Sequence, residues 1–371
     1  MSTPVQMTEP APPPVSHPGA WRVSWHGLRT VARLELRQRV RSTRWIVALV
    51  VWFVVVGGIT LLATGALSAI GGGVVREQRG PLLWAIVAYL VLGLGLVVTP
   101  TLTSTAINGD RNAGTLAILQ VTLLSPAEIV LGKLAAAWLA AMAFLVASLP
   151  FFVLALALGG TPVVSAFAVV ALIALLLAAV CGIGIGLSAF TARVAGSTVA
   201  TFASVVGLAV ISPILFGVTF PSIQDQADVR VFRSTSSFRG PTSADDCRWT
   251  SETRTVWHTE RTWWLLAINP FVVLADGSAT PADLTSVSPF ASLRESVRGA
   301  RSGASLATNE CWGWETGTRF DPPEPVPDPS AAPIWPWGLG ANLLLGAGGV
   351  WTAVRRLSIP QGGLPKGVRV A

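Results

Sequence analysis

The sequence is poor in charged residues. Asp, Glu, Lys and Arg make up 12% of the 371 residues, whereas 51% are hydrophobic and the mean hydropathy is +0.60. Ordinary soluble domains carry about 25% charged residues. This composition excludes a soluble globular protein of this length and predicts an integral membrane protein in contact with the lipid bilayer.

Lysine and histidine are scarce as well. The only two lysines are Lys133 and Lys366, and neither is followed by the Ser or Thr that a nucleotide-binding P-loop requires. The three histidines have no cysteine or carboxylate at metal-ligand spacing, and no triad-like arrangement stands out. We therefore expect no cofactor, no metal site and no catalytic residue in this chain, and no enzyme activity of its own.

Long uncharged stretches are present instead, and each is long enough to cross a bilayer as a helix. None of them contains Asp, Glu, Lys, Arg or His, so a carrier driven by a proton or sodium gradient is the weaker hypothesis. The Gly-rich run 182–186 lies inside one stretch, where small residues let helices pack closely. The pattern predicts an all-α membrane protein with six transmembrane helices, at 45–67, 82–107, 134–158, 163–190, 197–216 and 334–354.

The segments around these stretches differ in character. The Pro-rich, polar residues 1–20 are expected to be disordered, and they lack the layout of a signal peptide. In residues 21–44 arginines recur every fourth position from Arg29 to Arg41, which predicts a basic amphipathic helix on the membrane surface. The remaining parts are a block of five helices at 45–219 with a loop at 108–133, a long loop at 220–333, the last helix at 334–354 and a tail at 355–371.

The net charge of +7 has a positional explanation. The loop 220–333 carries ten Arg and fourteen Asp or Glu, while all other segments together carry sixteen Lys or Arg and five acids. With the N-terminus inside, fourteen of those sixteen basic residues lie in cytoplasmic segments. Such a distribution is typical of the basic residues that orient membrane helices, rather than of a nucleic-acid-binding surface. It predicts a multi-pass protein of the cell membrane, with both termini cytoplasmic and the 220–333 loop extracytoplasmic.

The extracytoplasmic loop has few apolar residues, and we expect a solvated, partly folded insertion rather than a substrate-gating lid. Within it, 263–275 is apolar but short and broken by Asn269-Pro270, which predicts an interfacial or re-entrant helix. Cys247 and Cys311 both lie in this loop, and an oxidising exterior favours a disulfide between them.

The segment 110–133 is the one substantial charged interruption between apolar stretches. Its second half predicts a helix start, because Ser125 can cap the helix, Pro126 fits the first helical position and Glu128 can complete a capping box. Its first half, 116–124, is apolar on every side but too short to span. The lipid interface and another protein are both possible covers for it.

The same segment contains residues that follow the pattern of a known family: Arg111, Gly114-Thr115-Leu116, Leu119, Thr122, Leu124-Ser125, Glu128-Ile129-Val130 and Gly132-Lys133. In these residues it resembles the cytoplasmic loop of ABC-2 type transporter permeases, which in that family docks on a separate ATP-hydrolysing subunit. One departure is Leu123, where the family often has proline.

The resemblance implies a permease subunit of an exporter, with two permeases, identical or related, and two ATPases per complex. ATP and Mg would be bound by the partner ATPase, and the 21–44 helix would be an elbow helix that also touches it. The alternative is a membrane-anchored receptor or assembly factor that acts through the 220–333 loop. The ATPase-coupling residues implied are Arg111, Gly114, Thr115, Leu116, Leu119, Glu128, Gly132 and Lys133.

Overall fold

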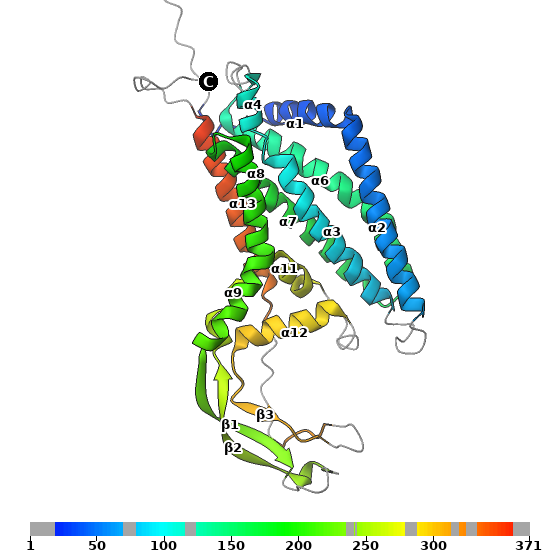
Figure 1. The fold of residues 1–371 in the computed structure, drawn as a ribbon, viewed down its shortest axis with the longest axis vertical. Coiled ribbons are helices and arrows are strands. Elements are labelled where there is room, and N and C mark those ends of the chain that lie inside the picture. Colours follow the sequence, from blue (N-terminus) through cyan, green and yellow to red (C-terminus); the bar gives the residue numbers. More distant parts are fainter. Residues whose placement is uncertain are drawn as a thin grey trace, which may run out of the picture.

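The computed structural model describes residues 19–69, 79–115, 124–234, 241, 243–278, 288–312, 319–323 and 332–358. This part of the chain is mostly helical, with a long helical bundle at one end and a small sheet at the other (Figure 1). The chain is a multi-pass membrane protein. Within the described residues, five helical stretches are long and apolar enough to cross a membrane: Thr43–Ala69, Arg79–Asn112, Pro126–Ala157, Val163–Phe190 and Val194–Ser222.

Helix α1 (Trp25–Val40) lies across one end of the bundle, and α2 (Thr43–Ala69) runs down from it (Figure 1). Helix α1 starts at Trp25 because the Ser24 side chain caps it, accepting a hydrogen bond from the Gly27 amide at 3.0 Å. The face with Gly27, Val31 and Ala32 is buried, whereas the arginines of the other face are exposed. Helix α1 is therefore docked on the bundle by its small-residue side.

The core of the bundle lies between α3 (Arg79–Thr103), α6 (Pro126–Ala157) and α7 (Val163–Phe190). A short helix, α4 (Asn108–Asn112), follows α3. The α6–α7 connection is so short that the two helices form an antiparallel hairpin. The Trp52 indole of α2 donates a hydrogen bond to Ser148 of α6 at 2.9 Å, which ties α2 to this core.

The fifth apolar stretch consists of α8 (Val194–Val206), a π-helical turn η2 (Gly207–Ile211) and α9 (Ser212–Thr219). The segment 263–275 does not form one spanning helix. It forms α10 (Trp264–Ala267) and α11 (Pro270–Gly277), and Asn269 caps α11 by accepting from the Phe271 amide at 2.9 Å. Helix α11 is buried against α7, α12 (Pro289–Ser302) and α13 (Trp335–Leu357).

Helix α13 covers the sixth stretch predicted from the sequence, but it is not among the five described helices that meet the length and hydropathy requirements. The physical reason is composition: the helix holds Asn342 and ends in Arg355 and Arg356. It nevertheless runs closely along α7 (Figure 1). Its first turn is held by Asp276, whose carboxylate accepts from the Ile334 and Trp335 amides at 2.6 and 2.7 Å.

The 220–333 loop adds a small β-structure to the predicted all-α architecture. β1 (Gln224–Ser234) pairs antiparallel with β2 (Cys247–Trp257) and parallel with β3 (Ala307–Asn309), in the order β2-β1-β3. Among the described residues the sheet has two small apolar clusters, one of Val229, Val231 and Val256 and one of Phe232, Cys247 and Cys311. Short helical turns flank it at η3 (Phe220–Ser222), η4 (Ala244–Asp246) and η5 (Thr259–Arg261).

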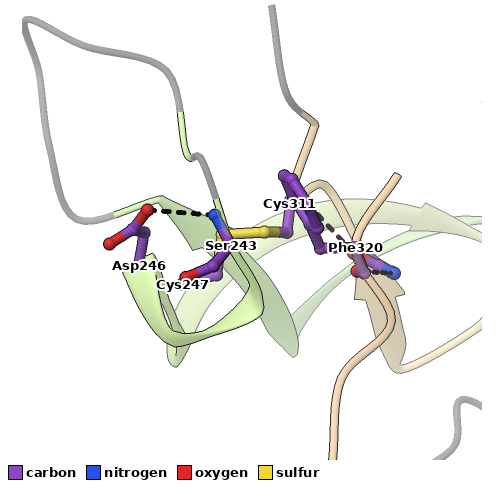
Figure 2. The surroundings of a disulfide bond; sticks show 6 residues. Ser243, Asp246, Cys247, Cys311 and Phe320 are labelled. Atoms are coloured by element: carbon purple, nitrogen blue, oxygen red, sulfur yellow. Dashed lines mark hydrogen bonds between the residues drawn. A yellow bond between two sulfur atoms is a disulfide. The ribbon is translucent and has the colours of Figure 1, made fainter. Parts of the chain in front are cut away.

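Cys247 and Cys311 form a disulfide in the structure, with a Cα–Cα distance of 6.1 Å. Figure 2 shows that it joins the start of β2 to the segment after β3. Beside it, the Phe320 amide donates to the Cys311 carbonyl at 3.0 Å, and the Ser243 amide donates to Asp246 at 3.1 Å. The disulfide therefore joins two distant parts of the loop, and its cysteines lie in a small apolar cluster with Phe232.

Candidate functional site

The start of α6 carries the capping box that the sequence predicts. Ser125 Oγ accepts a hydrogen bond from the Glu128 amide at 3.1 Å, and Glu128 Oε2 accepts one from the Ser125 amide at 2.8 Å. These two bonds satisfy donors that the first turn of a helix otherwise leaves free. The capping box therefore fixes the start of α6, at the end of the 110–133 segment.

Glu128 also reaches a second helix. Its Oε1 accepts a hydrogen bond from the Ser24 amide at 2.8 Å, and Ser24 is the residue that caps α1. Nearby, Ser125 Oγ donates to the Arg22 carbonyl, and the Ala127 amide donates to the Ala20 carbonyl at 3.1 Å. One carboxylate therefore holds the first turns of α1 and α6 together.

Gly132 lies where α1 crosses α6. A Cβ atom at this position would lie 2.6 Å from the Val31 Cβ and 3.2 Å from the Leu28 carbonyl oxygen. A Cβ at Gly27 would lie 2.7 Å from the Glu128 carboxyl carbon. The two helices can approach this closely only because both positions are glycine.

Lys133 joins a third element to this crossing. Its ammonium group forms ion pairs with Glu35 of α1 and with Asp110 of α4, the latter at 2.5 Å. The Lys133 side chain is only 2% exposed. Removing one partner of a buried ion pair leaves an uncompensated charge and costs about 3 to 5 kcal/mol. We call Glu35, Asp110, Glu128 and Lys133 the polar junction.

The residues implied as a coupling site divide into two groups. Glu128, Gly132 and Lys133 are buried and connect α1 to α6. Gly114 and Thr115 are exposed, and Gly114 has a φ of +72° that favours glycine. Arg111 of α4 is half-buried, while Leu116 and Leu119 lie outside the described residues.

Two members of the polar junction, Glu35 and Asp110, are not among the site residues predicted from the sequence. A signal for Glu35 existed, because it is the only acidic residue of the basic segment 21–44. An isolated acid on the buried side of a basic helix is a candidate for a buried ion pair. Its partner could not be chosen, since the Lys133 contact spans 98 positions of the chain.

The polar junction lies within the part of the chain that matches a known protein family. A comparison with curated protein sequences gives no match. The family described as "ABC-2 family transporter protein" matches residues 29–288, which is more than half of the chain and includes the polar junction. Members of that family are membrane components of ABC transporters, so the chain is a transport component associated with an ABC ATPase subunit. This multi-pass helical protein belongs to the ABC-2 family of transporter proteins.

Proposed function

We propose that this chain is the permease subunit of an ABC exporter, and that a separate ATPase docks on the 110–133 segment. The observation that supports this most directly is the polar junction. The exposed turn at Gly114 and Thr115 leads into the apolar residues 116–124, and both flanks of that segment are attached to α1 through Asp110, Glu128 and Lys133.

Through this attachment, a movement of a docked ATPase would be transmitted to the helices of the bundle. A displacement of the 116–124 tip would move α4 and α6, and the polar junction would make α1 move with them. Since α1 leads directly into α2, the displacement would reach a second membrane helix. Two permease subunits, identical or related, would then switch their interface between inward- and outward-open states. ATP and Mg would be bound by the ATPase subunits.

The topology belongs to the same proposal. We place α13 as a sixth crossing, both termini in the cytoplasm and the disulfide-bonded sheet outside the cell membrane. The support is the charge distribution together with the arrangement in Figure 1, where the end of α13 and helix α1 lie at one end of the bundle and the sheet at the other. An oxidising exterior also suits the disulfide.

The test of the coupling assignment is Leu119→Asp, with Leu119→Met as the matched control. A buried leucine contributes about 1.5 to 3 kcal/mol when it leaves water, and Asp would in addition place a charge in an apolar groove. We expect a normal amount of Leu119→Asp protein in the membrane that no longer co-purifies with its ATPase. Leu119→Met keeps the volume and should keep the ATPase. Full ATPase binding and export by Leu119→Asp would show that the tip contacts lipid or solvent.

One observation favours the second candidate, a receptor or assembly factor: the extracytoplasmic sheet is closed by a disulfide and is therefore a defined surface. The two functions separate experimentally. Purification of the native complex with an ATPase supports the permease, whereas a complex held only through residues 224–312, without an ATPase, supports the alternative.

A further inference from the structure

A cleft of about 730 Å³ lies beside α1, between the second half of that helix, the start of α2 and the end of α3. This volume is in the range of small-ligand sites, about 300 to 1,000 Å³. The lining changes along the cleft. Near α1 it is polar, with Gln38, Arg39, Ser42 and Arg44, while further along α2 and α3 it is apolar.

Arg39 is the most informative residue in this cleft. Its Nη2 donates a hydrogen bond to the Leu102 carbonyl at 3.1 Å, at the end of α3. Its Nη1 is buried and has no hydrogen-bond partner among the residues that the structure describes. Burial lowers the pKa of the Arg39 guanidinium from its usual value. A buried donor without an acceptor is costly, and Arg39 therefore keeps one unused hydrogen-bond donor beside the cleft.

The charges around the cleft favour an anion. Arg39 and Arg44 line it with two guanidinium groups, and the one carboxylate in the lining is that of Glu35. Glu35 is already engaged by Lys133 in the polar junction. Lys133 is shared with Asp110, so the three cations Arg39, Arg44 and Lys133 exceed these two carboxylates by one positive charge.

We propose that the cleft binds an anionic glycerophospholipid of the cytoplasmic leaflet. Guanidinium groups bind phosphate through paired, charge-assisted hydrogen bonds, and basic pockets between membrane helices bind anionic lipid headgroups. The lipid phosphate lies against Arg39 and Arg44. One acyl chain follows the apolar residues Val51 and Val55 of α2 and Leu94 and Val98 of α3.

This occupant fits better than a soluble anion or a protein segment. A soluble anion would leave the apolar half of the cleft without a partner, and a protein segment would have to bring a negative charge beside an apolar stretch at membrane depth. A phospholipid carries a negatively charged phosphate and apolar acyl chains in one molecule. Because Glu35 and Arg39 are one turn apart on α1, the bound lipid also stabilises the α1 position that the polar junction fixes. The proposal takes the cytoplasmic side of α1 from the proposed topology, but it does not rest on ATPase docking.

The test measures lipid binding to the purified full-length chain by native mass spectrometry, with phosphatidylglycerol and phosphatidylcholine as probes. Arg39→Gln/Arg44→Gln removes both guanidinium groups of the cleft. Its matched control is Arg37→Gln/Arg41→Gln, which removes the same charge from exposed positions of α1 and its end that do not line the cleft. The Arg39→Gln/Arg44→Gln protein, which we call the cleft variant, should bind phosphatidylglycerol at least about tenfold more weakly than the wild type. The reason is that each charge-assisted hydrogen bond contributes about a factor of ten or more to the affinity. The control should change binding by less than about threefold.

A second variant covers the case in which loss of the Arg39–Leu102 bond impairs folding. Ala48 lines the apolar part of the cleft and is exposed, so Ala48→Phe fills the cleft without changing any charge or any buried contact. We expect Ala48→Phe to lose phosphatidylglycerol as the cleft variant does. Arg44→Gln alone, which leaves the Arg39 bond intact, should show an intermediate loss.

Four results would overturn the proposal. The first is an equal loss of phosphatidylglycerol binding in the cleft variant and its control, and the second is unchanged phosphatidylglycerol binding by Ala48→Phe. The third is an affinity of the wild-type chain for phosphatidylcholine equal to that for phosphatidylglycerol. The fourth is the formation of disulfide-linked dimers by Ala48→Cys in native membranes. The last result would show that a second copy of the chain occupies the cleft.

Discussion

Glu128 shows how a single side chain can connect two helices. Its two carboxylate oxygens accept from the Ser24 and Ser125 amides, so the residue completes one cap and supports another. From the sequence alone it had one role, in the capping box of α6. The contact with Ser24 makes its loss more costly than the loss of a cap.

We therefore predict graded destabilisation at this position. Glu128→Gln keeps one acceptor oxygen and leaves one amide unpaired, whereas Glu128→Ala leaves two. An unpaired donor costs about 1 to 3 kcal/mol where it is buried, as at Ser125, and less at the part-buried Ser24 amide. The melting temperature of the purified chain should fall in the order wild type, Gln, Ala, and ATPase co-purification should fall with it. Thr30→Ala, on the exposed face of α1, is the control. A Glu128→Ala variant as stable as Thr30→Ala would contradict a role for the second contact.

At the scale of elements, α7 and α13 pack closely against each other. A Cβ at Gly182 would lie 2.5 Å from the Gly346 carbonyl oxygen, and a Cβ at Gly346 would lie 2.7 Å from the Ala179 carbonyl oxygen. These neighbours are backbone atoms, which cannot rotate away. The Gly-rich run that the sequence places in a membrane helix is thus a packing surface.

This surface makes a position-specific prediction. Gly349→Ala places its methyl group on the Gly182 backbone, so it must separate α7 from α13 at a cost of about 1 to 3 kcal/mol. Gly348→Ala has open space around it and should be neutral or slightly stabilising, because alanine favours a helix by about 1 kcal/mol over glycine. Thermal unfolding in detergent compares the two. Equal melting temperatures would mean that the helices do not pack in this register.

The broken segment between α10 and α11 depends on two asparagines. Asn269 Nδ2 donates to the Ala209 carbonyl of the π-helical turn at 2.9 Å, and Asn342 Nδ2 donates to the Ile268 carbonyl at 2.9 Å. Irregular backbone in a membrane protein is tolerated where other groups satisfy its polar atoms. The break therefore supplies a donor to the π-helical turn, and α13 supplies a donor to the break.

We predict that the disulfide stabilises the loop that contains the small sheet. Its core is small, and the Cys247–Cys311 bond closes a loop with a sequence separation of 64. The chain-entropy relation gives such a bond roughly 4 kcal/mol, an upper value for a loop that is partly structured. Cys247→Ser should make the loop sensitive to protease in intact cells while the membrane helices still insert. Alkylation of the unfolded wild-type chain without reductant should find only Cys181 free; three free thiols would contradict the bond.

At the scale of the whole molecule, the proposed topology places the polar junction and the sheet on opposite sides of the membrane (Figure 1). Cysteines introduced at Ser2 and Gly367, which lie outside the described residues, should be shielded from impermeant thiol reagents in intact cells. A cysteine at Ser251, exposed on β2, should react. Labelling of Gly367→Cys in intact cells would show that α13 does not cross the membrane, or that another segment does.

Much of the architecture could be predicted from the sequence because it depends on local composition. The apolar stretches marked the five long helices and the position of α13, and the Ser125 to Glu128 spacing marked the α6 cap. The β-sheet could not be predicted in this way. Residues 224–234 and 247–257 are largely polar, and only five of these residues are buried: Val229, Val231, Phe232, Cys247 and Val256.

The sequence by itself determined the membrane class, the helix positions and the residues of the 110–133 segment that resemble a coupling loop. These depend on hydropathy and on contacts within a helical turn, which are set by neighbouring residues. Only the tertiary structure decided what the buried half of that segment contacts. The bonds of Glu128 to Ser24 and of Lys133 to Glu35 span 104 and 98 positions. They exist because Gly27 and Gly132 let α1 and α6 approach closely, and such a contact between distant residues leaves no periodic pattern in the chain.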